Sequence, residues 1–166
     1  MNVVVDVRDE FEGWSTAWAD KGADMPDLDA FTARAIATAL ETSKVKLMDG
    51  VEVSVLYCGD GFMQELNKQW RGKDQPTNVL SFPAASGKAL QRTPTLGDII
   101  VSCDTVVREA KAENKTFADH LAHMLVHGSL HLVGFDHEVD DEAEDMEAHE
   151  RQALAKLGIA DPYGES

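Results

Sequence analysis

The sequence predicts an α+β fold, in which a small mixed sheet of about four strands packs with about five helices in a single domain. Short segments rich in β-branched residues occur among longer segments whose apolar residues recur every three or four positions. Elements of both kinds without regular alternation are typical of an α+β fold. The chain has 166 residues, of which 43% are hydrophobic, and this is enough for one core. We therefore expect residues 1–166 to form one domain.

Four segments are predicted to be β-strands. They share short length, apolar content and flanking turn residues, and they span residues 3–7, 51–57, 77–82 and 96–102. The second alternates apolar and polar residues over its first half, and the third ends at Pro83. Residues 84–95 contain Gly, Ser and basic residues and are predicted to be a loop.

Five segments are predicted to be helices. They share apolar residues at helical spacing, and they span residues 27–43, 60–70, 103–114, 118–132 and 140–157. Thr116 is a candidate N-cap for the fourth. In the second, Phe62, Leu66 and Trp70 lie four positions apart. We interpret the acidic residues 8–26, which include Trp14 and Trp18, as a short helix or loop against the core.

Composition narrows the class of protein. The formal net charge of −15 argues against a general nucleic-acid binder, because phosphate backbones attract basic surfaces. An acidic substrate could still bind where basic residues gather around a cleft. The sequence has no apolar run long enough to span a membrane and no signal-peptide pattern, and Cys58 and Cys103 lack metal-binding spacing. We therefore expect a cytoplasmic protein with reduced thiols and no membrane association.

A cluster of three histidines carries the clearest chemical signal. If residues 118–132 are helical, His127 and His131 are four positions apart and point to the same face. Gly134 can adopt a left-handed conformation, end the helix and turn the chain so that His137 reaches the same point. Three neutral imidazoles with a fourth position left open are typical of a catalytic zinc site. The sequence therefore predicts one Zn²⁺ ion bound by the helix and the following turn.

The spacing of these residues also matches the metalloprotease pattern H-E-x-x-H-x-x-G-x-x-H, except at one position. Gly128 stands where those proteases have the glutamate that takes a proton from zinc-bound water. The metal geometry can survive without this glutamate, but the peptidase base is missing. We predict a metal-dependent hydrolase that is not a peptidase of that kind.

Three stretches of the chain together resemble the YbeY family of bacterial ribosomal RNA maturation factors. They are H-G-S-L-H-L-V-G-F-D-H with the acidic residues after it (127–146), L-N-K-Q-W-R-G-K-D-Q-P-T-N-V-L-S-F-P (66–83) and L-G-D-I-I-V-S (96–102). The resemblance implies a small zinc-binding endoribonuclease that acts on single-stranded RNA. It further implies roles in 3′-end maturation of 16S rRNA and in ribosome quality control. The implied partners are the 16S rRNA precursor and the small ribosomal subunit with its basic proteins.

The resemblance also assigns site residues. It implies that His127, His131 and His137 are the zinc ligands and that Arg71 is a functionally required arginine, so Arg71 and His127 are the predicted catalytic residues. The chemistry of arginine is consistent with a catalytic role for Arg71, because a guanidinium fork can hold a phosphate and stabilise charge in the transition state. The alternative is an arginine that only interacts with a helix dipole. Phe135 departs from the tyrosine that is common in the family.

Two side chains are candidates for supporting the metal ligands. His123 is four positions before His127, but a helical turn rises about 5.4 Å and Zn–N bonds are about 2.0–2.1 Å. Three ligands along one straight helix are therefore too far apart, and we expect His123 to pack or to contact a ligand. Asp136 is expected to orient a ligand imidazole or cap the turn, with a role as base for water as the alternative.

The charged residues near these motifs allow two interpretations each. Lys68 and Lys73 are candidates for RNA binding beside Arg71, or they belong to a solvated turn. The acidic run from residue 138 to 150 is interpreted as the exposed face of the last helix, or else as a docking surface for a basic ribosomal protein. Trp70 and Phe82 could stack on bases, but both occupy apolar positions that indicate core.

Several alternatives for the chemistry stay open at this point. Either zinc hydroxide attacks the phosphate, or the RNA 2′-hydroxyl attacks and leaves a 2′,3′-cyclic phosphate. A zinc hydrolase of a peptide or small ester is an alternative class, against which the glycine at position 128 argues. The other alternative is a non-catalytic ribosome assembly factor in which zinc only stabilises the fold. The open coordination position and Arg71 argue against it.

Overall fold

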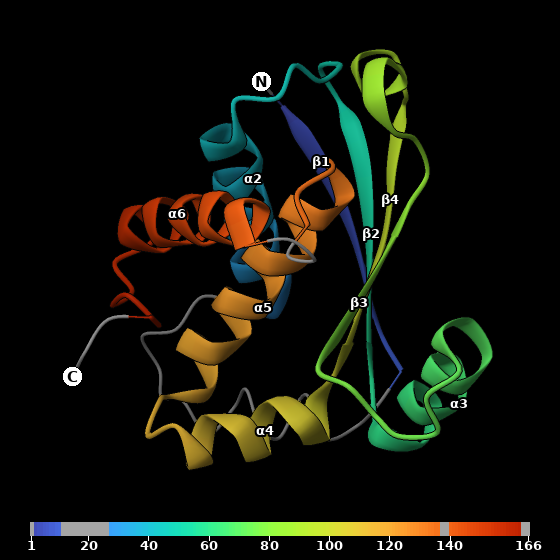
Figure 1. Ribbon diagram of the computed structural model, residues 1–166, viewed down its shortest axis with the longest axis vertical. Helices are drawn as coiled ribbons and strands as arrows, with labels where there is room; N and C mark the ends of the chain where they lie inside the picture. Colours follow the sequence, from blue (N-terminus) through green and yellow to red (C-terminus); the bar gives the residue numbers. More distant parts are fainter. Residues whose placement is uncertain (1, 11–26, 137–139, 164–166) are drawn as a thin grey trace.

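A computed structural model describes residues 2–10, 27–136 and 140–163 of the chain. Figure 1 shows one sheet with helices on its two faces: α2, α4, α5 and α6 lie on one side and α3 lies on the other, near one end of the strands. The elements in chain order are β1 (Val3–Asp9), α2 (Leu28–Ser43), β2 (Val51–Cys58), α3 (Asp60–Arg71), β3 (Val79–Pro83), the 3₁₀ helix η1 (Gly87–Gln91), β4 (Thr95–Ser102), α4 (Cys103–Ala112), α5 (Phe117–Leu132) and α6 (Asp140–Lys156). The predicted α+β fold, with four strands and five α-helices among the described residues, is confirmed.

The sheet is mixed, with the strand order β1-β2-β4-β3. β1, β2 and β4 are parallel, whereas β3 runs antiparallel to β4 and forms an edge, with Leu80 opposite Ile100. Alternate residues of β2 point into the core, and Val53 and Val55 are fully buried there. β3 starts at residue 79, two residues later than predicted.

The central helix of the molecule is α5, which packs against β3, β4, α2, α4 and α6. Leu121 and Leu125 belong to the main core with the inner face of the sheet, whereas Val126 and Leu130 belong to a second core cluster with residues of α6. Because α5 is enclosed on several sides, the histidines near its C-terminal end have fixed positions. None of the described helices is long and apolar enough to cross a lipid bilayer.

The start of α3 is tied to β4 and α4 through one carboxylate. Asp60 accepts hydrogen bonds from Ser102 (2.7 Å), Thr105 (2.7 Å) and Arg108 (2.6 Å). Burial by itself would raise the pKa of Asp60, but these hydrogen bonds outweigh it and lower the pKa below its ordinary value of 3.8. Arg108 of α4 therefore forms an ion pair with Asp60.

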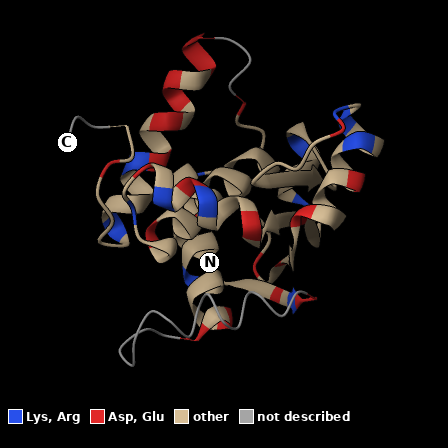
Figure 2. Ribbon diagram, turned by 90° about the horizontal axis from the view of Figure 1, so that it is seen from below, with Lys and Arg blue, Asp and Glu red and all other residues tan. Residues whose placement is uncertain are grey.

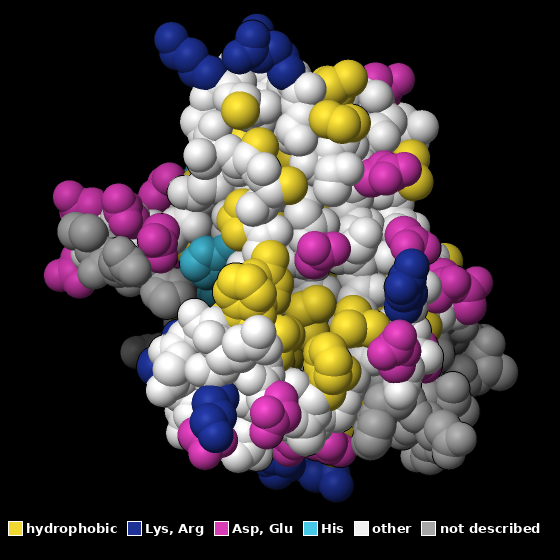
Figure 3. Space-filling view, turned by 90° about the vertical axis from the view of Figure 1, so that its right-hand side faces the viewer, with side chains coloured by type: hydrophobic (Ala, Val, Ile, Leu, Met, Phe, Trp, Pro, Cys, Tyr) yellow, Lys and Arg dark blue, Asp and Glu magenta, His cyan; other side chains and the backbone are white. Residues whose placement is uncertain are grey.

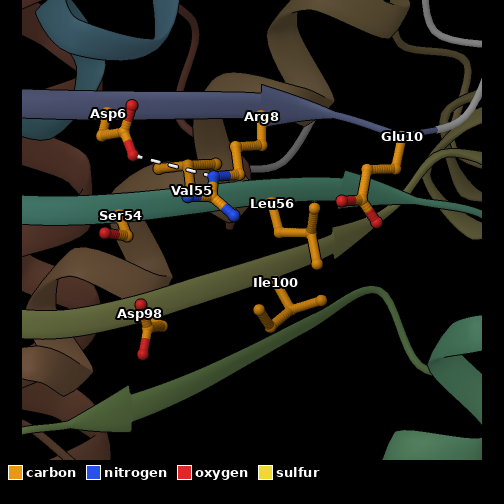
Figure 4. A pocket seen from close by; sticks show the side chains of 8 residues that line it. All are labelled: Asp6, Arg8, Glu10, Ser54, Val55, Leu56, Asp98 and Ile100. Carbon is orange, nitrogen blue, oxygen red and sulfur yellow. Dashed lines mark ion pairs between the residues drawn. The ribbon is translucent and has the colours of Figure 1, made fainter.

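The outer face of the sheet is only partly covered. A cavity of about 280 Å³ on this face is lined by side chains of β1, β2 and β4, including Arg8 and the carboxylates of Asp6, Glu10 and Asp98 (Figure 4). Arg8 lies 3.9 Å from Asp6. This surface is acidic and contains no histidine among its lining residues, so it lacks the chemistry that the sequence predicts for the site.

Two of the three residues in the apolar stripe of α3, Phe62 and Trp70, lie at the surface, whereas Leu66 is half-buried against a small core cluster. This corrects the prediction that Trp70 is part of the core. Phe62 and Trp70 are 49% and 63% exposed, because α3 packs on the sheet through Met63, Leu66 and Asn67 instead. Trp70 meets Phe82 edge-on, with 5.7 Å between ring centroids, and Phe82 is half-buried. Figure 3 shows hydrophobic side chains gathered in the middle of this face.

The predicted loop at residues 84–95 contains η1, whose Leu90 is buried in the main core, so this segment is partly ordered by packing. Residues 8 and 9 continue β1 and do not belong to the predicted short helix or loop at 8–26, whereas Trp14 and Trp18 lie outside the described residues.

Candidate functional site

The helix that carries the predicted ligands begins and ends as the sequence indicated. The Thr116 side chain accepts a hydrogen bond from the Asp119 amide at 3.1 Å and caps the N-terminus of α5. At the other end, Gly134 has a φ of 101°, and its amide donates to the His131 carbonyl. The Phe135 amide donates back to the Leu130 carbonyl. These bonds end the helix directly after the two histidines and turn the chain.

His127 and His131 line a cavity of about 600 Å³ at the edge of the sheet. β3 and the residues before it form one wall, α5 and its terminal turn form the other, and the C-terminal end of α3 contributes Arg71. The remaining lining residues are Thr77, Asn78, Val79, Leu80, Ser81, Pro83, Gly134, Phe135 and Asp136. In the space-filling view, histidine side chains reach the surface beside the apolar patch (Figure 3).

The two imidazoles are placed as two ligands of one metal ion would be. The Nε2 atom of His131 lies 3.1 Å from the Nε2 atom of His127. Two nitrogens at about 2.0–2.1 Å from a tetrahedral zinc ion are about 3.3 Å apart, so the pair fits a shared ion. No three His, Cys, Asp or Glu side chains of the described residues gather as a metal site. His137, the predicted third ligand, lies outside the described part of the chain.

The buried carboxylate of Glu150 contacts His127 on the side of its ring away from His131. Glu150 of α6 is 1% exposed, and its Oε1 atom lies 2.9 Å from Nδ1 of His127 and 3.1 Å from Nε2 of His123. Its Oε2 atom accepts a hydrogen bond from the Tyr163 hydroxyl at 2.8 Å. An imidazole that is bonded through Nδ1 presents Nε2 to the cavity, which is the arrangement of a carboxylate–histidine–metal triad.

Reasoning from the sequence missed Glu150, and the prediction that the whole acidic run faces solvent is wrong at this residue. The sequence spacing could have indicated that Glu150 is buried, because it recurs at helical period with three apolar residues. These are Met146, Ala153 and Leu154, and all four residues are buried. A glutamate on the apolar stripe of a helix must be paired when it is buried. The remaining acidic residues of α6 are exposed or half-buried.

The environment of Glu150 keeps this carboxylate ionised. Burial alone would raise its pKa, but hydrogen bonds and charge from His123 and His127 outweigh the burial and lower the pKa of Glu150 to about 2. Burial raises the pKa of Tyr163 far above its ordinary value, and the negative charge of Glu150 raises it further. The tyrosine is therefore a hydrogen-bond donor to an acceptor-only group.

The two predicted supporting residues lie in different places. His123 is buried one turn before His127, contacts Glu150, and lies 3.2 Å from the Tyr163 hydroxyl through the same ring nitrogen. It is not among the residues that line the cavity. Asp136 lines the cavity beside the turn that ends α5.

Close packing explains why a glycine occupies the position of the protease glutamate. A Cβ atom on Gly128 would lie 3.1 Å from Ile99 Cγ2 and Ser81 Oγ and 3.3 Å from Val79 Cγ2. The Ser81 hydroxyl donates to the Gly128 carbonyl at 2.9 Å, which joins α5 to β3. These contacts are closer than ordinary van der Waals distances, so any side chain at position 128 requires Ile99, Ser81 or Val79 to move, which is a physical reason for the departure from the protease pattern.

Of the three predicted basic residues, one reaches the cavity. Arg71 is exposed at the end of α3 and lines the cavity with the histidines. Lys68 and Lys73 are exposed but are not among the lining residues, and Lys68 lies 4.0 Å from Asp74. The turn after α3 is held by a hydrogen bond from the Asn67 side chain to the Gln75 carbonyl at 2.8 Å.

The fold and the cavity define a small α+β protein with a histidine-lined site open to solvent, the arrangement expected of a metal-dependent hydrolase. A family model described as Endoribonuclease YbeY matches residues 18–158. The chain belongs to the YbeY family of endoribonucleases, as the sequence motifs indicated.

Individual relatives match over nearly their whole length. The chain is 50% identical over 159 residues to Endoribonuclease YbeY of Azorhizobium caulinodans, covering 96% of this chain and 95% of that protein. It is 44% identical over 165 residues to Endoribonuclease YbeY of Methylocella silvestris, covering 99% and 88% of the two chains. A solution structure of a Thermotoga maritima protein has the same fold, with a TM-score of 0.55, 24% identity and coverage of 98% of this chain and 100% of that chain.

Proposed function

We propose that this chain is a Zn²⁺-dependent endoribonuclease that cleaves single-stranded RNA in 3′-end maturation of 16S rRNA and in ribosome quality control. The observation that carries the proposal is the pair of imidazole Nε2 atoms 3.1 Å apart in a cavity that also contains Arg71. Membership of an endoribonuclease family supplies the reaction class. His127, His131 and His137 would hold one zinc ion.

The residues of the cavity divide the chemistry between them. A bound zinc ion would supply a Lewis acid and a water whose pKa is lowered towards about 7. Arg71 would hold the phosphate through its planar fork of donors and stabilise the charge that develops on the phosphoryl oxygens. Its exposed position at the end of α3 lets it reach a substrate in the cavity.

RNA binding would depend on this local site, because the chain as a whole repels phosphate. The net charge is −15, and Figure 2 shows acidic residues along much of α6. We propose that the acidic surface of α6 docks basic proteins of the small ribosomal subunit in the cytoplasm. Lys68 and Lys73, which lie near Arg71 in sequence, would contact RNA outside the cavity. We further propose that residues 1–166 act as one domain.

The test compares cleavage of a labelled single-stranded RNA by four proteins purified in parallel. They are the wild type, His131→Ala, Arg71→Ala and the control Arg92→Ala, which removes an exposed arginine that does not line the cavity. Zinc content and thermal unfolding are measured for each. We expect both site variants to lose cleavage, only the histidine variant to lose zinc, and the control to keep both.

One other outcome would overturn the proposal, and another would remove one residue from it. Equal residual cleavage in all four proteins would identify a contaminating ribonuclease and would favour an assembly factor without its own catalysis. Full cleavage by Arg71→Ala would remove the arginine from the mechanism. The 3′ ends of the products distinguish the two modes of attack, because only attack by the 2′-hydroxyl leaves a 2′,3′-cyclic phosphate.

A further inference from the structure

We infer that Glu150, held by Tyr163, is a positioning residue that fixes His127 with a proton on Nδ1 and an unprotonated Nε2 that faces Nε2 of His131 at 3.1 Å. The inference rests on the proposed function, because its consequence is a ring nitrogen ready to bind metal. It adds two residues from α6 and the segment after it to a site whose predicted residues all come from residues 68–137.

The hydrogen-bonding capacity of the Glu150 carboxylate determines which neighbouring atoms carry protons. An ionised glutamate only accepts hydrogen bonds, so each neighbour within bonding distance must donate. Glu150 has three such neighbours: Nδ1 of His127 at 2.9 Å, Nε2 of His123 at 3.1 Å and the Tyr163 hydroxyl at 2.8 Å. The proton of each imidazole is therefore assigned by geometry.

His127 and His123 must therefore be opposite tautomers. His127 bonds Glu150 through Nδ1, whereas His123 bonds it through Nε2. In His123, Nδ1 is then the unprotonated nitrogen, and this buried atom has no hydrogen-bond partner among the described residues. One carboxylate thus gives the imidazoles opposite orientations: the unprotonated Nε2 of His127 faces His131 in the cavity, and Nε2 of His123 is bonded to Glu150.

Burial of the Glu150 carboxylate limits the partners that could replace it. Glu150 is 1% exposed, and the helix that carries it packs on α5 through Met146, Ala153 and Leu154. Water therefore cannot replace the carboxylate as the partner of His127. Tyr163 packs edge-on against His123, with ring centroids 5.5 Å apart, and its hydroxyl occupies the second carboxylate oxygen. Carboxylates in this position commonly change metal affinity by about 10- to 100-fold when they are removed.

The experiment combines a metal-free and a metal-binding measurement on Glu150→Gln, Tyr163→Phe and the control Glu144→Gln. The control removes one negative charge from an exposed position of the same helix. Long-range ¹H–¹⁵N spectra of the metal-free proteins, at a pH well above the ordinary histidine pKa of about 6.5, report the tautomer of each imidazole. His127→Gln and His123→Gln identify the signals, and calorimetric titration with Zn²⁺ gives the affinity.

We expect the wild type and control to show Nδ1–H for His127 and Nε2–H for His123. In Glu150→Gln, we expect His127 to become a mixture of tautomers and the Kd for Zn²⁺ to rise about 10- to 100-fold. Tyr163→Phe should shift the tautomer populations of His127 and the Kd for Zn²⁺ in the same direction but by less. It removes the hydroxyl donor to Glu150 and leaves the hydrogen bonds from His127 and His123. A loss of thermal stability without a change of tautomer would indicate a purely structural role and would overturn the inference.

Two results separate this inference from the proposed function. An Nε2–H tautomer of His127 in the wild type would overturn the inference even if zinc binds. A wild type that binds no Zn²⁺ would overturn the proposed function, whereas the predicted pair of opposite tautomers in that protein would still support the role of Glu150 in orienting His127.

Discussion

Replacement of Gly128 by alanine tests whether the contact between α5 and the sheet is as close as the structure indicates. The added Cβ would lie 3.1 Å from Ile99 Cγ2 and Ser81 Oγ and 3.3 Å from Val79 Cγ2. Forcing extra atoms into a packed core typically costs about 1–3 kcal/mol. Alanine in place of glycine inside a helix stabilises it by about 0.8–1.0 kcal/mol. We therefore expect a net destabilisation of about 0–2 kcal/mol.

A second glycine isolates the packing contribution. Gly61 lies in the first turn of α3, and a Cβ at this position would meet no atom within 4 Å. Gly61→Ala should therefore be neutral or stabilising. The difference in the free energy of unfolding between the two variants then measures the packing cost at Gly128, about 1–3 kcal/mol.

The assay is thermal and urea unfolding of both variants and the wild type. Each kcal/mol corresponds to a shift of about 2–4 °C in the melting temperature of a chain of this size. Gly128→Ala should melt below the wild type and Gly61→Ala at or above it. If Gly128→Ala is stabilised as much as Gly61→Ala, the neighbouring side chains move aside without cost. The absence of the protease glutamate would then need another explanation.

Three further predictions concern the sheet, the thiols and the start of α3. Gly97 has a φ of 135°, and a Cβ there would overlap the Phe82 carbonyl oxygen, so Gly97→Ala should lower the melting temperature more than Gly128→Ala does; an unchanged melting temperature would contradict this. Burial, with smaller contributions from nearby acidic groups, raises the pKa of Cys58 and Cys103 to about 12. A thiol reagent at mildly alkaline pH should therefore react with them only after urea unfolding. Rapid labelling of the folded protein would refute this prediction. The pKa of Asp60 is lowered on folding, so this group stabilises the folded state above its unfolded pKa and loses that effect as pH falls through the folded value. Asp60→Asn should therefore lower the melting temperature near neutral pH, with a gap to the wild type that narrows below about pH 4; a gap that widens in acid would contradict the sign.

The sequence was informative wherever a residue acts through its own segment. Thr116 and Gly134 could be recognised as the start and end signals of α5, because capping and left-handed turns depend on a few neighbouring positions. The strand segments were recognisable from apolar residues flanked by turn residues, although β3 was placed two residues too early. These features require no knowledge of the distant part of the chain.

The features that the sequence did not reveal depend on tertiary contacts. The spacing of Phe62 and Trp70 predicted an apolar stripe on α3 but could not tell that the helix would pack through Met63 and Asn67. Glu150 stood in a run of acidic residues, and only the packing of α6 on α5 separates it from its exposed neighbours. Its partners, 23 and 27 residues earlier, are brought to it by that packing.

The position of β3 at the edge of the sheet has a consequence for the working temperature of the site. The hydrogen bond from Ser81 to Gly128 joins segments 47 residues apart, and among the described strands β3 pairs with β4 alone. Edge elements open more easily than the core in local unfolding. Opening of β3 would separate the two walls of the cavity while α5 stays folded, and the fraction of molecules competent to bind would fall accordingly. Amide hydrogen exchange should therefore show β3 opening before β2, and affinity for substrate should decline on heating before the protein unfolds.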